Sequence, residues 1–573
     1  MKTTEQRQGR ENIPCKAAPY KSFGRTAIKL RKFFVIFGLL CALLVMSACS
    51  STADTAAFSG GSGTEEDPYL ISTPEDLWEV AERINTKETH NEYAAAFYRL
   101  TADIDLGGKK EWVPIGYYAE NAGSFRFEGT FDGGGHTVQG IRVDYKDPLL
   151  GQNQTDFGLF GRLEGTVKDL TISDSSIAAD GESSINVGAV AGEVRNSVLT
   201  NCHTTDSVTV SGSYYAGGLC GGANQSSALS NCSNAASVAS TGTVGCAGGI
   251  TAYASCHIEA CINSGSVEAY QGDAAGIAVT ASNGVADCEN TGDVSAEDYA
   301  AGIVCSFDDG ALNSGMNDAS VMLLRCTNAG NISSEKDTAG GIAVSCRTGS
   351  IADCRNTGSV TSPKETGGIL AYFQPGVFGT PCEIFTVSGC ENSGAVSSTG
   401  NYAAGGICGM IYGEETRLVF ENCVNSGSVE AAGLTDVLVS SAKAGGIIGT
   451  GSVSALEVRS CRNSGSVRGY AVSGGILGEA SPVQGAEAAS LLVQSCTNSG
   501  SIYTVFPGGL AQEIYAGGIV GCCPIALLDE NLLPLFDDLR IENCENTGKL
   551  DGDREPDILC TDDLCGSWQS RLS

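Results

Sequence analysis

Basic residues are scarce in this sequence, and so are histidine, proline and tryptophan. The 573 residues include 34 lysines and arginines against 66 aspartates and glutamates, which gives a net charge of −32. A chain this acidic lacks the basic surface on which nucleic-acid binding depends, so we exclude nucleic acid as a partner. Only 17% of the residues are charged and 42% are apolar, so the chain can bury a large core.

Patterns that bind transition metals are also missing. The four histidines do not cluster, no Cys-x-x-Cys pair occurs among the 25 cysteines, and there is no His-Glu-x-x-His. We therefore predict no metal site and no cofactor. Asp103 and Asp105, in Asp-Ile-Asp-Leu-Gly-Gly, are weak candidates for calcium, although aspartate beside glycine is more typical of a turn.

The first 48 residues have the form of an export signal. Nine lysines and arginines lie in residues 1–32, and an uncharged run follows from Phe33 to Ala48. Sixteen residues are fewer than the ~20 that span a bilayer comfortably. A plain signal peptide or an uncleaved anchor is one interpretation. The ending Val45-Met46-Ser47-Ala48-Cys49 instead resembles a bacterial lipobox.

The lipobox resemblance implies that Cys49 is acylated and becomes the mature N-terminus. Residues 49–63, rich in Ser, Thr, Ala and Gly, then form a flexible tether. A diacylated cysteine holds a protein durably at a membrane face. The sequence thus predicts an extracytoplasmic protein, anchored to the membrane at the bacterial cell surface.

One phrase, Cys-x-Asn-x-Gly-x-Val or a close variant, recurs through most of the chain. Its copies are 27 to 48 residues apart and about 34 on average, which predicts one structural turn per copy. Clear copies begin at Cys261, Cys288, Cys326, Cys354, Cys390, Cys423, Cys461, Cys496 and Cys544, and weaker ones at Cys202 and Cys232.

A second phrase, Gly-Gly-Ile or Gly-Gly-Leu, lies between these copies, for example at residues 248–250, 340–342 and 405–407. Apolar positions alternate over four to six residues before each Gly, Asn or Ser turn, and no helical period is sustained in the repeats. Strands this short cannot bury an apolar face alone, but stacked coils pair every backbone group at ~4.8 Å. We therefore predict an all-β parallel solenoid.

Stacking explains why one residue type returns at one place in each coil. We expect the cysteines to form a buried and mostly reduced interior row, because neighbouring side chains in register point the same way and make poor disulfides. Cys522 with Cys523 and Cys560 with Cys565 are the exceptions. We expect the asparagine two residues after each cysteine to occupy a left-handed turn and to bond its neighbours' amides. The glycine four residues after the cysteine should relieve the next bend.

The combination of Gly-Gly-Ile/Leu-x-Gly with Cys-x-Asn-x-Gly-Ser-Val resembles the GLUG repeat of bacterial surface proteins. The resemblance covers residues 157 to about 550, and Gly129–Val138 and Phe157–Gly161 resemble the opening coils, with Leu170 in the position that cysteine holds later. It implies a right-handed parallel β-helix of about 11 to 13 coils in an adhesin-like lipoprotein.

Both ends of such a solenoid need a cap that covers the terminal strands. Thr73-Pro74-Glu75-Asp76, followed by apolar residues at helical spacing, predicts an amphipathic helix capped by Thr73. We thus assign residues 64–156 to an N-terminal cap and the first coils, 157–550 to the repeat β-helix, and 551–573 to an acidic C-terminal tail or cap.

Tyrosines precede several Gly-Gly phrases. Aligned coils would place them in a row able to stack on sugar rings, although tyrosine also packs corners with its hydroxyl in water. These tyrosines are the candidate ligand-binding residues: Tyr215, Tyr299, Tyr402, Tyr470 and Tyr515.

No residue set points to catalysis. β-Helices that cleave polysaccharides need paired carboxylates. The candidates here lie beside glycine as turn residues do: Asp103 and Asp105, Asp132, and the pair Asp308 and Asp309. With no catalytic set in the sequence, the resemblance to the GLUG repeat implies a non-catalytic, adhesin-like protein that binds a polysaccharide, a mucin or a host matrix protein. A polysaccharide lyase or glycoside hydrolase is one alternative, and a structural envelope stalk is another.

Overall fold

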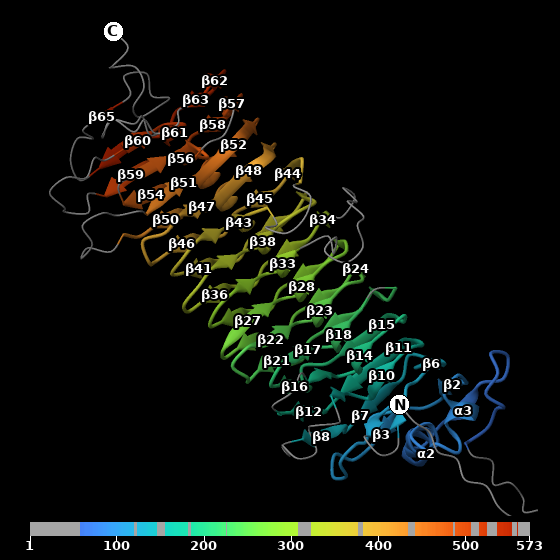
Figure 1. Ribbon diagram of the computed structural model, residues 1–573. Helices are drawn as coiled ribbons and strands as arrows, with labels where there is room; N and C mark the ends of the chain where they lie inside the picture. The colour runs from blue at the N-terminus through green and yellow to red at the C-terminus, as the bar shows by residue number, and fades with distance from the viewer. Residues whose placement is uncertain are drawn as a thin grey trace, which may run out of the picture. The chain divides into compact units, whose positions relative to one another are not determined.

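The computed structural model describes a repeated coil of short strands (Figure 1). It covers residues 58–119, 123–145, 155–181, 185–224, 226–307, 322–375, 382–433, 442–470, 472–484, 488–505, 515–523, 536–552 and 558–559. Cys49, the pair Asp308 and Asp309, and the pair Cys560 and Cys565 lie outside these residues.

Each repeat contributes strands to five parallel ladders, named here in chain order. Ladder 1 ends at the Gly-Gly pair, ladder 2 follows it, ladder 3 precedes the cysteine, ladder 4 carries the asparagine, and ladder 5 follows the Gly-x-Val turn. Ladders 2, 3 and 4 belong to one 37-stranded sheet, and ladders 1 and 5 are sheets of 13 strands each. The repeat count and the parallel β-helix predicted from the sequence are confirmed.

Ladders 1 and 2 carry the strands on either side of each Gly-Gly pair. The strands of ladder 1 are β9 (Asp156–Phe157), β13 (Asn186–Gly188), β17 (Tyr215–Gly217), β22 (Gly245–Gly248), β27 (Gly272–Ala275), β32 (Ala300–Ala301), β37 (Ala339–Gly340), β42 (Thr366–Gly367), β47 (Ala404–Gly405), β51 (Lys443–Gly445), β55 (Val472–Gly474), β60 (Tyr515–Gly517) and β65 (Ile558–Leu559). The strands of ladder 2 are β10 (Phe160–Leu163), β14 (Ala191–Val194), β18 (Cys220–Ala223), β23 (Thr251–Ala254), β28 (Ala278–Ala281), β33 (Val304–Phe307), β38 (Ala343–Cys346), β43 (Leu370–Phe373), β48 (Cys408–Glu421), β52 (Ile448–Arg459), β56 (Leu477–Pro482) and β61 (Val520–Cys522).

Ladders 3, 4 and 5 complete each coil. Ladder 3 includes β11 (Thr166–Ser173), β15 (Val198–Thr204), β19 (Ala228–Ser230), β24 (His257–Glu259), β29 (Val285–Ala286), β34 (Met322–Leu324), β39 (Ser350–Ala352), β44 (Ile384–Ser388), β57 (Ser490–Gln494) and β62 (Asp538–Glu542), and the long strands β48 and β52 extend into it. Ladder 4 consists of the two-residue strands β20 (Ser233–Asn234), β25 (Ile262–Asn263), β30 (Glu289–Asn290), β35 (Thr327–Asn328), β40 (Arg355–Asn356), β45 (Glu391–Asn392), β49 (Val424–Asn425), β53 (Arg462–Asn463), β58 (Thr497–Asn498) and β63 (Glu545–Asn546). Ladder 5 consists of β8 (Arg142–Tyr145), β12 (Ser176–Ala179), β16 (Thr209–Gly212), β21 (Ser237–Ser240), β26 (Val267–Ala269), β31 (Val294–Ala296), β36 (Ile332–Ser334), β41 (Val360–Ser362), β46 (Val396–Ser398), β50 (Val429–Ala431), β54 (Val467–Tyr470), β59 (Ile502–Val505) and β64 (Leu550–Gly552).

The N-terminal residues cover the first coils. Helix α2 (Pro74–Ile84) begins with a capping box in which Thr73 Oγ1 accepts from the Asp76 amide at 3.2 Å and the Asp76 carboxylate accepts from the Thr73 amide at 3.0 Å. Its face of Leu77, Val80, Ala81 and Ile84 is buried, as predicted. Figure 1 shows α2 and α3 (His90–Tyr93) at the same end of the stack as β2 (Phe97–Leu100) and β3 (Ile104–Asp105), where β1 (Tyr69–Ile71) pairs with β2.

The cysteines of the repeat form a continuous interior row. Ten of the eleven are buried, the last, Cys544, is half-buried, and all are free thiols. Each thiol hydrogen-bonds to nearby carbonyls, as Cys326 does to Leu324 and Val285, at 3.5 Å in both cases. Leu170 pairs directly with Cys202, which confirms that leucine takes the cysteine position in the earlier coil.

The asparagines also form an interior row, which corrects the prediction that they occupy left-handed turns. Each Asn Nδ2 donates to the Asn Oδ1 of the next coil at 2.7–2.8 Å, in an unbroken series from Asn234 to Asn546. The left-handed conformation belongs instead to the residue before each cysteine, with φ between 51° and 63°. A buried amide needs all of its hydrogen bonds, and stacking supplies them where an exposed turn would not.

Candidate ligand-binding face

Ladders 1 and 2 fold against each other and leave a crease on the outside of the coils. The first glycine of the pair makes this possible, because a Cβ on Gly405 would lie 1.8 Å from the carbonyl oxygen of Cys408. The second glycine faces inward, where a Cβ on Gly302 would lie 2.5 Å from Asn328 Cγ. These two close approaches, on opposite faces of the same bend, explain why most coils carry Gly-Gly, although alanine replaces the first glycine at Ala275 and Ala301.

Two rows of side chains line the crease, one from each ladder. In ladder 1, strand pairing places the following residues at equivalent positions, given in coil order: Asp156, Asn186, Tyr215, Cys246, Asp273, Tyr299, Thr338 and Glu365, and further along Lys443, Val472 and Tyr515. In ladder 2 it runs through Arg162, Glu193, Gly222, Tyr253, Thr280, Ser306, Ser345, Tyr372, Met410, Thr450, Glu479 and Cys522. Most of these outward-facing residues are only half-exposed because the opposite row shelters them.

The centre of the crease has an apolar floor. Small side chains including Ala301, Cys305 and Val344 form a buried cluster there, and Tyr299 and Tyr372 pack against it from the two rows. Aromatic rings standing on an apolar floor beside polar groups are typical of a surface that binds a ligand with one apolar face.

Carboxylates flank these tyrosines. Asp273 Oδ1 accepts a hydrogen bond from the Tyr299 amide at 3.1 Å. Burial raises the pKa of Asp273 to about 6, and the charges of Asp298 and Asp337 add to the shift. Burial also raises the pKa of Glu365, which lies further along the row and accepts from the Thr338 hydroxyl at 3.3 Å. The centre of the crease thus holds carboxyl groups that are easier to protonate than ordinary ones.

A hollow of about 390 Å³ continues the crease toward the C-terminal coils. Lys443 of ladder 1 reaches across to Glu479 of ladder 2, with Nζ 2.7 Å from Oε1. The rest of the lining includes four hydroxyl groups, one amide and one thioether, from Tyr412, Thr450, Ser452, Ser481, Gln374 and Met410. This lining offers hydrogen-bond donors and acceptors along several successive coils.

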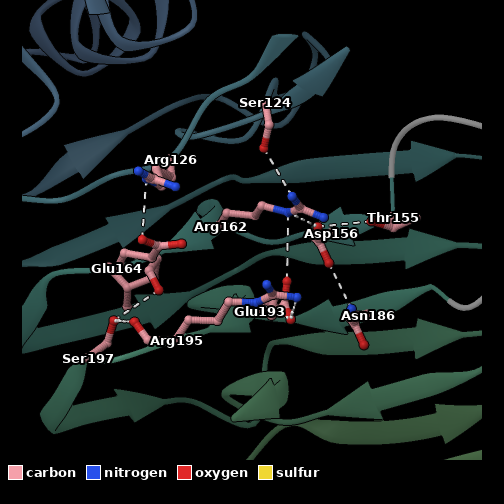
Figure 2. A network of polar contacts seen from close by, with 11 residues as sticks. Ser124, Arg126, Thr155, Asp156, Arg162, Glu164, Asn186, Glu193, Arg195 and Ser197 are labelled. Atoms are coloured by element: carbon pink, nitrogen blue, oxygen red, sulfur yellow. Dashed lines mark hydrogen bonds and ion pairs between the residues drawn. The ribbon is translucent and has the colours of Figure 1, made fainter. Parts of the chain in front are cut away.

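At the N-terminal end, ion pairs bridge the two rows (Figure 2). The buried Asp156 carboxylate accepts from Arg162 Nε at 2.8 Å and from Asn186 Nδ2 at 2.7 Å. Glu193 accepts from Arg195 Nε at 2.6 Å, and its pKa is raised by burial and by the charge of Asp156. This network fixes the side chains at the mouth of the crease.

The five predicted tyrosines do not form a single row. Tyr215, Tyr299 and Tyr515 share one position in ladder 1, although other residue types separate them. Tyr402 lies before strand β47 and outside that row. Tyr470 belongs to ladder 5, where it packs against a core cluster. Coils of unequal length move these two out of register, and a ligand-binding role for the five stays a prediction.

Backbone amides engage both calcium candidates, and one of the two acts as a turn residue. Asp103 Oδ1 accepts from the Thr137 amide of the next coil at 3.0 Å, whereas Asp105 Oδ1 accepts from the Gly107 amide within its own turn at 2.7 Å. Asp132 accepts from the Gly134 amide at 2.8 Å in the same way. Within the described ranges, no three His, Cys, Asp or Glu side chains are grouped so that they could hold a metal ion.

Several crease residues were missed by sequence reasoning. Tyr253 and Tyr372 follow the Gly-Gly phrase instead of preceding it, and Asp273 and Glu365 are isolated acids with no motif around them. Only their position relative to the Gly-Gly phrase could have identified them. Asp273 and Glu365 lie two residues before the first glycine or the alanine that replaces it, and Tyr253 and Tyr372 lie four residues after the second glycine.

No protein-family model matches the chain. Over 183 residues, 30% of its length, the chain is 33% identical to halomucin of Haloquadratum walsbyi, and the match spans 2% of that protein. Over 172 residues it is 32% identical to a protein of Evansella cellulosilytica named "Putative Gly-rich membrane protein", of which the match spans 18%. The chain thus matches only a small part of each of these relatives.

A solved structure, titled as a "putative immunoglobulin A1 protease" from Bacteroides ovatus, aligns with 68% of this chain and 80% of its own at 17% identity and a TM-score of 0.34. Among the residues that the structure describes, none forms a helix long and apolar enough to cross a membrane.

Proposed function

We propose that this protein is an exported, GLUG-like surface protein, anchored through Cys49, that binds an extended glycan along the crease without cleaving it. The carrying observation is the crease centre, where Tyr299 and Tyr372 stand on an apolar floor and polar side chains follow in both directions. A crease that continues from coil to coil suits a linear polymer, because successive units of the polymer meet successive coils.

The names of the matched relatives support a surface location. One is named a mucin and the other a membrane protein, and the net charge of −32 suits a soluble extracellular surface. The partners we propose are the membrane, through the lipid on Cys49, and a polysaccharide, a mucin or a host matrix protein, at the bacterial cell surface.

Retention on immobilised polymers tests this function. Protein beginning at Ser50 is applied to neutral and acidic polysaccharides, mucin and matrix proteins. We expect retention that weakens at least tenfold in Tyr299→Ala and Tyr372→Ala. Tyr270→Ala is the matched control, since Tyr270 is 57% exposed and its position belongs to neither row of the crease. Equal weakening of retention by all three variants would refute binding at the crease. A wild-type protein that none of the polymers retains would also refute it, and would favour a structural stalk.

Polysaccharide cleavage is a second candidate, and one observation favours it. Asp273 combines a pKa raised to about 6 with a position beside Tyr299 in the crease, and a carboxyl with such a pKa can act as a general acid near neutral pH. Release of new sugar ends by the wild type, lost in Asp273→Asn with binding retained, would establish cleavage. Retention with no release supports the non-catalytic function.

A further inference from the structure

Gly222 interrupts the ladder 2 row of the crease. It pairs with Glu193 of the preceding coil and with Tyr253 of the following one. Across the crease, Asn186 and Tyr215 occupy the ladder 1 row at the corresponding coils. Glu193, Tyr253, Tyr215 and Asn186 therefore surround a position that has no side chain, which we call the Gly222 notch.

Packing does not require glycine at this position. A Cβ on Gly222 would have one neighbour within 4 Å, Asn186 Oδ1 at 3.7 Å, and the backbone φ of Gly222 is not positive. The contrast with adjacent glycines is sharp, because a Cβ on Gly221 would lie 2.6 Å from the Val187 amide nitrogen and one on Gly217 would lie 1.9 Å from the Cys220 oxygen. The fold needs Gly217 and Gly221, whereas at Gly222, whose backbone is buried beneath its neighbours, an added methyl group would meet only Asn186 Oδ1, at an ordinary contact distance.

Aromatic rings form one side of the notch. The Tyr215 and Tyr253 rings lie 6.4 Å apart, and Tyr214 supports Tyr215 with a ring contact at 4.5 Å. Tyr253 is 38% exposed, which is high for a side chain in these two rows. An exposed ring of this kind offers a flat apolar surface with a polar tip.

Fixed oxygen atoms form the other side. Asn186 donates Nδ2 to the buried Asp156 carboxylate at 2.7 Å, and no hydrogen bond to Asn186 Oδ1 is formed by the residues that the structure describes. Glu193 is held by Arg195, and its Oε2 lies 3.7 Å from Arg162 (Figure 2). Both groups are positioned before any ligand arrives, which lowers the entropic cost of binding.

We propose that the Gly222 notch is a subsite for one neutral pyranose ring of the polymer, and this proposal rests on the proposed function. The apolar face of the sugar packs on Tyr253, and its hydroxyls donate to Asn186 Oδ1 and to the Glu193 carboxylate. Two coil steps of ~4.8 Å place the backbones of Glu193 and Tyr253 about 10 Å apart, so that one sugar ring can contact both the Tyr253 ring and the Glu193 carboxylate. Glu193 disfavours an anionic sugar at this position.

Filling the notch provides the test. Gly222→Val adds a β-branched side chain that suits a strand and meets open space, so we expect it to fold. Ser237→Val is the matched control, because Ser237 is an exposed strand residue of ladder 5 and belongs to neither row of the crease. The probes are xyloglucan, galactomannan and starch as neutral polymers and polygalacturonate as an acidic one, with dissociation constants from affinity electrophoresis and folding checked by thermal melting.

We expect Gly222→Val and Tyr253→Ala each to weaken binding of a neutral polymer at least tenfold, and Ser237→Val to change it less than twofold, with melting temperatures unchanged. Wild-type binding that survives Gly222→Val would overturn the subsite and leave the proposed function standing. Binding restricted to polygalacturonate would likewise overturn it, while a wild type that binds no polymer would overturn the proposed function itself.

Discussion

Asn290 Nδ2 donates to Asn328 Oδ1 at 2.7 Å, and the same nitrogen donates to the Gly292 carbonyl at 2.9 Å. Both N–H groups of the buried amide are thereby satisfied, one within the coil and one by the next coil. Asn328 repeats this arrangement toward Asn356. Each asparagine is therefore both the acceptor for one neighbour and the donor for the other.

Asn328→Ala should destabilise the coils on both sides of it. The change leaves an Asn290 N–H and the Asn356 Oδ1 without their partners in a dry interior, which costs ~3 kcal/mol. Chemical denaturation measures the loss, and hydrogen exchange locates it around residues 290–356. Asn546→Ala is the comparison, because Asn546 ends the series and is half-buried, and we expect it to cost less than half as much. Equal costs would show that the row does not act cooperatively.

Replacement by alanine should have opposite effects on stability at Gly302 and at Gly222. In Gly302→Ala the new methyl group would lie 2.0 Å from the Gly341 oxygen, so the coil must distort at a cost of more than ~3 kcal/mol. In Gly222→Ala the methyl group meets open space, and the loss of glycine flexibility in the unfolded chain stabilises by ~0.5 kcal/mol. Melting temperatures that move in the same direction in both variants would contradict this reading of the Gly-Gly bend.

Ala260 carries backbone strain that glycine would relieve. Its φ is 52°, in the left-handed region, and the equivalent residues in other coils are mostly Asp, Asn, Ser or Gly. Ala260→Gly should therefore stabilise the protein by about 0.5–1 kcal/mol, since the strain removed exceeds the entropy lost. Ala286→Gly, on the neighbouring strand with ordinary φ, should destabilise it. Thermal melting distinguishes the two, and a lower melting temperature for Ala260→Gly would count against the strain.

The sequence predicts the coil and its interior because both depend on local repetition. Cysteine returns every 27 to 48 residues, and strand pairing then places Leu170 on Cys202 without further information. The position of Asn328 was predicted and its orientation was not, because an asparagine suits a left-handed turn as well as a buried ladder. Only the stacked partner decides between the two.

The crease was beyond sequence reasoning for a different reason. It depends on which side of the Gly-Gly bend faces outward and on how insertions of unequal length realign the coils. Asp273 and Tyr299 become neighbours through strand pairing of β27 with β32, and nothing around Asp273 in the sequence marks it. The same realignment removes Tyr402 and Tyr470 from the row in which sequence reasoning placed them.

Asp273 should make stability depend on pH between about 4 and 6. Its pKa in the folded protein is about 6 against an ordinary 3.8, so folding binds a proton in this window. The stability that Asp273 contributes below pH 4 is lost as pH rises through 6. A pKa difference of about two units corresponds to ~3 kcal/mol at most.

Asp273→Asn keeps the oxygen that accepts from the Tyr299 amide and removes the charge. The variant should therefore melt higher than the wild type at pH 7 and equally at pH 4, whereas Asp206→Asn, at an exposed position, should match the wild type at both. An equal gain at pH 4 and pH 7 would mean that the charge of Asp273 is not the cause.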